Sequence, residues 1–260
     1  MKIIALGDVV GPAGTAAVAA ALRRIKLEEN AELAIVNAEN AYVGNGLDLR
    51  SAETLLASGA DILTGGNHSL RMHDTFNLYE ENEFVLRPHN YPKSAPGKGY
   101  TIVQLKNGRR VLVMNLAGQV FMDNCDMPFP VADALLDSLK GQYDISVCDF
   151  HAEATSEKNT FFLHFDGRIN IMFGTHTHVQ TADERLLPKG SAAITDLGMC
   201  GVSDGSVLGV KYDSVIGDYT NKVHNRFEKA DGAARICGAV FTVDDSTGYV
   251  TEVRRIAKDI

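Results

Sequence analysis

The strongest constraint on the fold is a repeated pattern in which a short apolar run ends in polar side chains. Residues 2–6, 32–36 and 60–64 are such runs near the start of the chain, and residues 145–150 and 169–173 are later ones. Runs of this length that alternate with helical spacing predict strands of an α/β sheet. Because ligands bind outside the carboxyl ends of such strands, the polar residues after each run are candidate site residues.

Beyond residue 99 the pattern changes. Residues 99–105 and 110–115 flank Asn107-Gly108, a dipeptide typical of β-hairpin turns. This departure from strand and helix alternation predicts a second, more antiparallel sheet. The remaining predictions are strands at 192–195, 239–243 and 249–253, helices at 15–29, 47–59, 71–81 and 131–139, and a helix that begins within 152–159.

Composition narrows the class of protein. The chain has 260 residues, of which 45% are hydrophobic and 22% are charged, so it can bury a large core. We find no repeat and no linker, and we expect one α/β domain over residues 1–260. The formal charge of −8 argues against a protein that coats nucleic acid or binds an anionic membrane, because both need a basic face.

The chain shows no sign of a membrane or secretory protein. No apolar run reaches the roughly 18 residues of a membrane span, and the first residues lack a signal-peptide pattern, so we expect a cytoplasmic protein. The four cysteines have no CxxC spacing and fit reduced thiols. The default for such cysteines is a small, buried hydrophobic residue, and Cys200, which is expected in a Gly-Met-Cys-Gly turn, is the one that could approach the site.

The polar residues after the predicted strands have side chains that bind metal ions. A mixture of carboxylate, amide and imidazole groups suits Mn, Fe or Zn better than Ca or Mg. The set is larger than one ion needs, and two ions that share a carboxylate would use nearly all of it. His176 and His178 alternate, so we expect both rings on one side of an extended segment. The candidates are Asp8, Glu39, Asn40, Asn67, His68, His151, His176 and His178.

Other interpretations of these residues stay open. A single aspartate after a strand often caps a loop, and a single histidine is usually a surface or core residue. A dinucleotide-binding module would use Gly7, Gly11 and Gly14 with Glu39 as the ribose-binding acid. However, Val9 stands where the central glycine belongs, and this module leaves the histidines unexplained.

The order of the motifs resembles that of the calcineurin-like metallophosphoesterases, whose pattern is D-x-H, G-D, G-N-H-D/E, a lone His and G-H-x-H. The stretches NAEN at 37–40, HAEATSEK at 151–158 and GTHTHVQTADE at 174–184 are similar to the YmdB-like bacterial branch. Three departures from the wider family accompany this resemblance. Val10 stands in place of a ligand histidine, Glu39 in place of the bridging aspartate, and Ser69 in place of the acid after Asn-His.

The resemblance implies an α/β fold in the form of a four-layer αββα sandwich, with two mixed β-sheets flanked by helices. It also implies two divalent or trivalent metal ions, Fe or Mn in preference to Zn. Glu39 would bridge the ions, and His68 would lie beside the phosphate and assist the leaving group. The first ion would also bind Asp8, Asn40 and His178, and the second would also bind Asn67, His151 and His176.

The activity implied is that of a dinuclear metal-dependent phosphodiesterase. Its substrates would be small nucleotides such as 2′,3′-cyclic nucleotides, attacked at phosphorus by a hydroxide that bridges the metals. The branch is associated with homo-oligomers, and the apolar loop at 117–130 is either a lid or a subunit contact. A regulatory metal-binding protein with little turnover remains the alternative.

Overall fold

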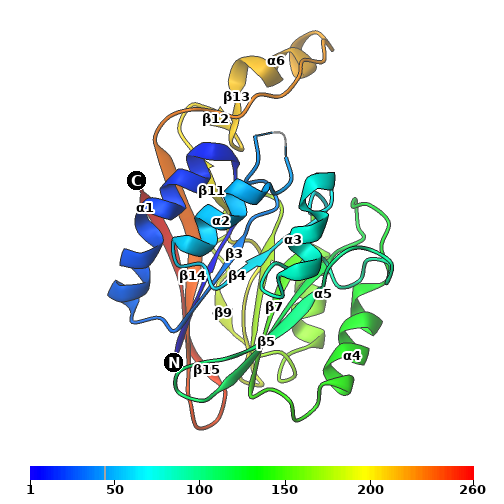
Figure 1. Ribbon diagram of the computed structural model, residues 1–260, viewed down its shortest axis with the longest axis vertical. Helices are drawn as coiled ribbons and strands as arrows, with labels where there is room; N and C mark the ends of the chain where they lie inside the picture. The colour runs from blue at the N-terminus through cyan, green and yellow to red at the C-terminus, as the bar shows by residue number, and fades with distance from the viewer. Residues whose placement is uncertain (44) are drawn as a thin grey trace.

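Two mixed β-sheets, packed face to face and covered by helices on their outer sides, form the body of the protein (Figure 1). The structure is a computed structural model that describes residues 1–43 and 45–260. The first sheet has the strand order β2-β11-β14-β1-β3-β4, with β15 paired to β14, and the second has the order β5-β6-β7-β8-β10-β9. The predicted four-layer αββα sandwich is confirmed.

The elements fall into four groups. The first sheet contains β1 (Lys2–Leu6), β2 (Asp8–Val9), β3 (Leu33–Asn37), β4 (Ile62–Thr64), β11 (Met199–Val202), β14 (Ala234–Val243) and β15 (Val250–Asp259). The second contains β5 (Tyr100–Gln104), β6 (Arg110–Ala117), β7 (Ile145–His151), β8 (Ile171–Thr175), β9 (Arg185–Leu186) and β10 (Ala192–Ile194). The helices of the body are α1 (Gly11–Glu29), α2 (Leu49–Ala57), α3 (Phe76–Glu81) after the 3-10 turn η1 (His73–Thr75), α4 (Pro128–Ser138) and α5 (Thr155–His164). A projecting unit contains β12 (Ser206–Val207), β13 (Val210–Lys211) and α6 (Tyr212–Thr220).

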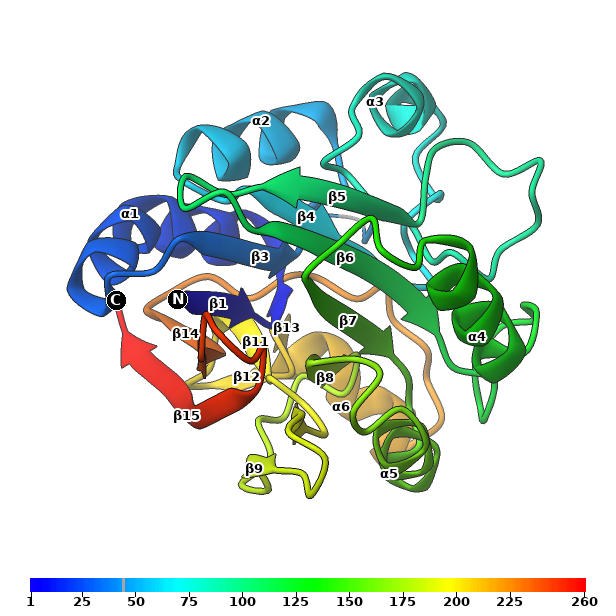
Figure 2. The ribbon, with the colours of Figure 1, turned by 90° about the horizontal axis from the view of Figure 1, so that it is seen from below.

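Three apolar layers hold the sandwich together. Alternate side chains of β1 enter different layers, because Ile3 packs between the sheets whereas Ile4 packs against α1 and α2. Phe173 and Phe241 meet in the middle layer, with ring centroids 6.4 Å apart. The third layer lies under α4 and α5, and Figure 2 shows the two helical layers on opposite sides of the sheets. Strands buried on both faces read as continuous apolar runs, which is why the sequence revealed them.

The prediction of a more antiparallel second sheet is wrong. The hairpin of β5 and β6 is antiparallel, as Asn107-Gly108 predicted, but β6, β7, β8 and β10 are parallel neighbours. The chain returns between β6, β7 and β8 through α4 and α5, which are the crossovers that parallel strands need. The long antiparallel pair, β14 with β15, belongs to the first sheet instead.

Some boundaries also differ from the sequence predictions. Helix α1 begins at Gly11 rather than at residue 15, because Pro12 fits the first turn of a helix, where its missing N–H costs nothing. Helix α4 begins at Pro128 and shortens the loop predicted at 117–130. The turn predicted around Cys200 is the strand β11, and its buried thiol lies 3.4 Å from the Cys237 carbonyl oxygen.

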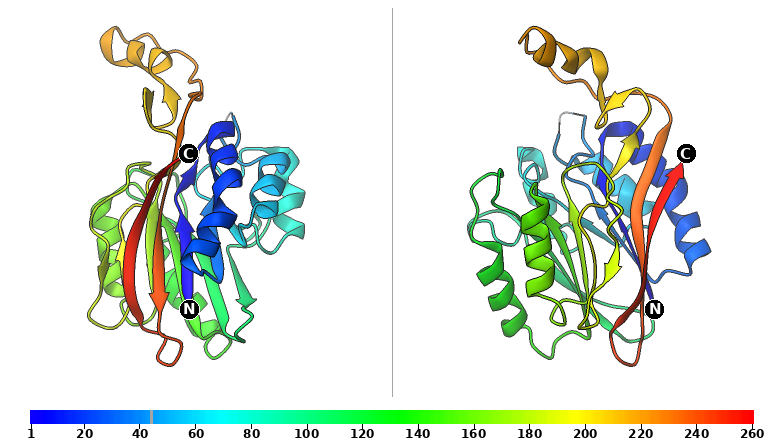
Figure 3. Two further views of the ribbon diagram at one scale, coloured as in Figure 1. Left: turned by 90° about the vertical axis from the view of Figure 1, so that its left-hand side faces the viewer. Right: turned by 180° about the vertical axis from the view of Figure 1, so that it is seen from behind.

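The segment between β11 and β14 was not predicted to have regular structure. It forms the β12 and β13 hairpin and α6, which stand away from the two sheets (Figure 3). Among the described residues, none of the helices combines the length and the apolar character that a membrane span requires.

Because Phe241 packs in the middle apolar layer, we expect Phe241→Ala to destabilise the protein strongly. This ring is fully buried between the sheets, and its removal leaves a cavity, so the free energy of unfolding should fall by about 3–5 kcal/mol in urea denaturation. Phe227→Ala is the matched control, because that ring is 57% exposed and its loss should cost no more than about 0.5 kcal/mol. Equal losses for the two variants would contradict the proposed packing.

Candidate metal centre

The predicted site residues meet where the carboxyl edges of the two sheets come together. Asp8 lies on β2, and Glu39 and Asn40 follow β3. Asn67 and His68 follow β4, His151 is the last residue of β7, and His176 and His178 follow β8. Parallel strands in both sheets bring these ends to one edge, although the residues come from distant parts of the chain.

One group of donor atoms surrounds His151. Its Nε2 atom lies 3.1 Å from Asn67 Oδ1, 3.1 Å from His176 Nδ1 and 3.3 Å from Glu39 Oε2. Glu39, His151 and His176 offer ligand atoms within 4.8 Å of one another. Four potential ligand atoms therefore converge on one point, an arrangement that a cation would stabilise.

A second group lies on the other side of Glu39. Asn40 Nδ2 is 2.8 Å from Glu39 Oε1 and 3.3 Å from His178 Nε2, which lies 3.8 Å from Asp8 Oδ1. Within the described part of the chain, this Asp8 oxygen is buried without a hydrogen-bond partner. An isolated buried carboxylate oxygen is costly, and a bound cation would remove that cost.

The two groups fit a pair of metal ions in their chemistry and in their space. Glu39 lies between the two groups and offers one oxygen to each. Residue 66 is a glycine, so no side chain fills the space beside His151 and Glu39. A Cβ atom built on Gly66 would lie 2.3 Å from His151 Nε2 and 2.4 Å from Glu39 Oε2. Asn40 directs its amide nitrogen to the second group, so its oxygen would become a ligand only after a half-turn of the amide.

The charged groups at the centre lie close enough to shift one another's pKa values. Burial raises the pKa of Asp8, whereas in Glu39 the nearby His151 and His68 outweigh burial and lower the carboxyl pKa. Burial lowers the pKa of His151, but Glu39 more than compensates and raises it to about 9. Burial and the neighbouring His151 lower the pKa of His176 to about 3. His176 is therefore a neutral ring, the form that binds metal.

The prediction that His176 and His178 extend to the same side is wrong. Their φ angles are 102° and 65°, so the segment is a turn and the two rings diverge. His176 faces His151, and His178 faces Asn40. Tertiary hydrogen bonds impose this conformation, because the His176 amide donates to Asp8 Oδ2 at 3.0 Å and His178 Nδ1 lies 3.1 Å from the Leu208 carbonyl oxygen.

A buried polar network orients His151. Its Nδ1 atom lies 2.9 Å from Thr175 Oγ1, which donates to Asp149 Oδ1 at 2.7 Å. Asn37 and Thr64 donate to the other Asp149 oxygen, and burial raises the pKa of Asp149 to about 6. The network holds the Nδ1 proton of His151 on Thr175, so Nε2 is the atom that would lose its proton to bind a metal. Our sequence reasoning missed it, although a carboxylate within an apolar strand was a usable signal.

His68 lies at the edge of the second group and is partly exposed. Its Nδ1 atom is 2.9 Å from Asn40 Oδ1 and 3.2 Å from Glu39 Oε1, and its amide donates to Glu39 Oε2 at 3.0 Å. These contacts orient the ring, although Ser69 stands where the wider family has an acidic residue. Ser69 instead accepts a hydrogen bond from the Gly66 amide at 2.9 Å.

Two further side chains support the centre and were not predicted. Glu153 Oε2 lies 3.2 Å from His176 Nε2, which favours the tautomer with a free Nδ1 atom. The Tyr91 hydroxyl donates to the Gly66 carbonyl oxygen at 3.3 Å and supports the turn that carries Asn67 and His68. Glu153 stands in the stretch 151–158 that the motif comparison had already singled out.

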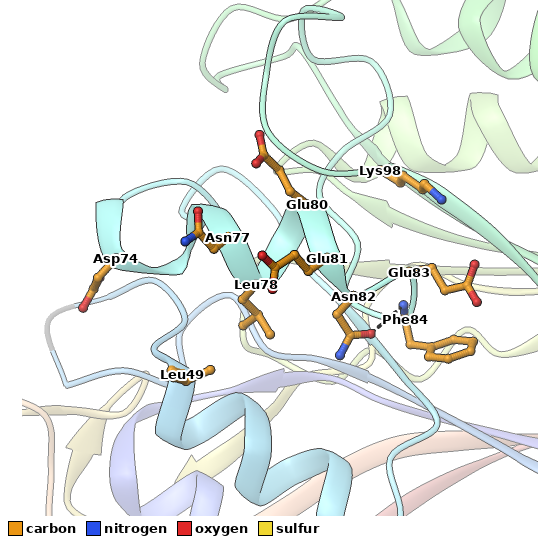
Figure 4. A pocket seen from close by; sticks show the side chains of 10 residues that line it. All are labelled: Leu49, Asp74, Asn77, Leu78, Glu80, Glu81, Asn82, Glu83, Phe84 and Lys98. Atoms are coloured by element: carbon orange, nitrogen blue, oxygen red, sulfur yellow. Dashed lines mark hydrogen bonds between the residues drawn. The ribbon is translucent and has the colours of Figure 1, made fainter.

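A large cavity lies away from the metal centre. It has a volume of about 700 Å³, and Asp74, Glu80, Glu81 and Glu83 give it an acidic lining (Figure 4). None of the predicted site residues lines it. A cavity with this charge disfavours an anionic ligand, so the metal centre remains the candidate site for phosphate chemistry.

Comparison with known proteins identifies the family to which the chain belongs. A family model described as "YmdB-like protein" matches residues 4–256. The chain belongs to this family. It is 40% identical over 256 residues to the 2′,3′-cyclic-nucleotide 2′-phosphodiesterase of Bacillus subtilis (strain 168), in a match that covers 98% of this chain and 96% of the relative.

Two solved structures are also similar to this YmdB-like chain. A hypothetical protein from Thermus thermophilus has a TM-score of 0.93 and 34% identity, covering 100% of this chain and 99% of that chain. A phosphatase from Mycoplasma pneumoniae also has a TM-score of 0.93, with 37% identity and coverage of 100% and 93%. The resemblance inferred from the motifs is confirmed.

The open space at Gly66 predicts that Gly66→Ala removes bound metal. The new methyl group would lie against His151 Nε2 and Glu39 Oε2, the atoms on which the first group of donors converges. We expect metal content per chain, measured by atomic emission after gel filtration, to fall at least about 10-fold. Circular dichroism at the same temperature provides the folding control. Full metal content in folded Gly66→Ala protein would contradict the position of the centre.

Proposed function

We propose that this YmdB-like protein is a dinuclear metal-dependent phosphodiesterase, a phosphoric diester hydrolase that acts on small nucleotides such as 2′,3′-cyclic nucleotides. The observation that carries the proposal is the position of Glu39. Its two oxygens face two separate groups of donor atoms, at 2.8 Å from Asn40 Nδ2 and 3.3 Å from His151 Nε2. The activity of the Bacillus subtilis relative supports the substrate class.

The ligand sets follow from the two groups. Asp8, Asn40 and His178 would hold one ion, Asn67, His151 and His176 would hold the other, and Glu39 would bridge them. When bound, the ions neutralise charge on the phosphoryl group and lower the pKa of water. The mixed oxygen and nitrogen ligands suit Fe or Mn, and Zn fits the same set.

His68 is the group best placed to assist the leaving oxygen. Glu39 Oε1 lies 3.2 Å from its Nδ1 atom and accepts the proton on that nitrogen, also when the Asn40 oxygen turns towards the metal. In the imidazolium form of the ring, Nε2 carries a second proton that His68 can give to the departing ribose oxygen, which leaves the neutral ring with its proton on Nδ1. The ring is partly exposed, which leaves it accessible to a substrate.

The alternatives differ in what they explain. A dinucleotide-binding module is disfavoured, because the Gly11 amide donates to the Asn40 carbonyl oxygen at 2.8 Å instead of facing a pyrophosphate. A regulatory metal-binding protein with little turnover has the same ligands, and only a rate measurement separates it from an enzyme. A homo-oligomer and a cytoplasmic location stay predictions.

The decisive test is hydrolysis of 2′,3′-cyclic AMP. Protein stripped with a chelator and reloaded with Mn²⁺ should release a nucleoside monophosphate, and chromatography identifies which ester bond breaks. Activity should disappear when the chelator is restored. Two bound metals per chain without turnover would favour the regulatory alternative.

Glu39→Gln tests the bridging carboxylate. Loss of one charge and one ligand oxygen should weaken metal binding and lower kcat/KM by at least about 100-fold. Glu80→Gln is the matched control, because it makes the same change in the acidic cavity and should leave both quantities unchanged. Full activity of metal-saturated Glu39→Gln protein would rule out the bridge.

His68→Ala separates catalysis from metal binding. Loss of a general acid should lower kcat by about 10²- to 10⁴-fold, whereas both metals should stay bound. Metal content and steady-state kinetics on the same sample provide the two measurements. If the variant loses metal instead, His68 is a ligand and its assignment to the leaving group is wrong.

A further inference from the structure

A buried ion pair lies behind the metal centre and takes no part in the ligand sets. Lys158 and Asp196 are each 1% exposed, and Lys158 Nζ lies 2.8 Å from Asp196 Oδ2. Lys158 comes from α5, and Asp196 follows β10. Taking two charges out of water is costly, and well-packed apolar residues often serve stability equally well. The pair therefore requires an explanation beyond packing.

Asp196 joins the two segments that carry metal-binding residues. Its Oδ2 atom also accepts from the Thr177 amide at 3.1 Å, and Thr177 stands between His176 and His178. Its Oδ1 atom accepts from the Gly198 amide at 2.8 Å. The Gly198 carbonyl oxygen in turn accepts from the Asp8 amide at 3.1 Å. One carboxylate thus fixes the histidine turn relative to the strand of Asp8.

The histidine turn needs such support. His176 and His178 both have positive φ angles, which L-residues other than glycine adopt infrequently. Strained residues persist where surrounding contacts over-determine them. Asp196 supplies the contact to the residue between them, and Asp8 supplies the contact to the His176 amide.

Lys158 provides the counter-charge to the Asp196 carboxylate. Its side chain passes close to β8, because a Cβ atom on Gly174 would lie 2.9 Å from Lys158 Cδ and 1.9 Å from the Thr195 carbonyl oxygen. The glycine before the histidine turn leaves room for this approach. The Asp196 carboxylate accepts from Lys158, Thr177 and Gly198 at once. A neutral side chain at this position could not serve all three donors equally well.

We propose that Lys158 and Asp196 form a positioning pair that sets the places of His176 and His178 relative to Asp8. This inference rests on the proposed metal centre. Neither residue touches substrate, and the pair acts through the backbone of the histidine turn. Its loss should therefore weaken metal binding even where the protein stays folded.

Lys158→Met provides the first test. The variant keeps most of the side-chain volume and removes the charge, so Asp196 loses its counter-charge. Affinity for Mn²⁺, measured by competition with a chelator, should fall about 10- to 100-fold. Circular dichroism identifies conditions in which the variant and the wild-type protein are both folded.

Lys26→Met is the matched control. Lys26 Nζ lies 2.6 Å from Asp61 Oδ2, in an ion pair next to the beginning of β4 and away from the metal centre. The same substitution there should leave Mn²⁺ affinity unchanged. If the loss of any lysine lowers Mn²⁺ affinity, both variants will bind Mn²⁺ equally weakly. That result would overturn the proposal.

Two further variants separate positioning from stability. In Lys158→Met with Asp196→Leu, both charges are replaced by apolar groups, so folding should recover while Mn²⁺ affinity stays low. Asp196→Asn retains the shape of the carboxylate and should show weaker Mn²⁺ binding even if Lys158→Met does not fold. Wild-type Mn²⁺ affinity in either variant would overturn the positioning role alone. A wild-type protein that binds no metal would overturn the proposed function together with this inference.

Discussion

Buried negative charge is the constraint on which this structure depends. Four carboxylates lie in the interior near the edge where the two sheets meet, and each requires compensation because an isolated buried charge is costly. Lys158 compensates the charge of Asp196, and Thr175 and Asn37 donate hydrogen bonds to Asp149. The other two face histidines and amides, and one of them keeps an oxygen without a hydrogen-bond partner in the described part of the chain. The four are Asp8, Glu39, Asp149 and Asp196.

The sandwich explains how these charges come together. Parallel strands of both sheets end at the same edge, and the apolar layer between the sheets fixes the distance between the two sets of strand ends. Asn37 of β3 donates to Asp149 of β7, so polar contacts cross the same boundary that the apolar side chains seal. A site assembled from both sheets cannot form before the sheets pack. Metal binding and folding should therefore be linked.

Local patterns predicted the strands and the ligand residues, whereas long-range contacts determined what the sequence missed. The strands that end near Asn37 and His151 were visible because burial on both faces leaves unbroken apolar runs. The rule that alternate side chains of an extended segment share one side gave the wrong direction for His176 and His178. Hydrogen bonds to Asp8 and Asp196 impose positive φ angles there, and no local rule anticipates them. Strand β11 reads as a turn because of its glycines, and its pairing partners β2 and β14 lie far away in the sequence.

The most direct test of the account is anomalous diffraction from crystals of the Mn²⁺-loaded protein. Two peaks about 3.5–4 Å apart are expected, and both should contact Glu39. One peak should lie against Asp8 and His178, and the other against His151 and His176. A single peak, or two peaks that do not share Glu39, would contradict the dinuclear centre.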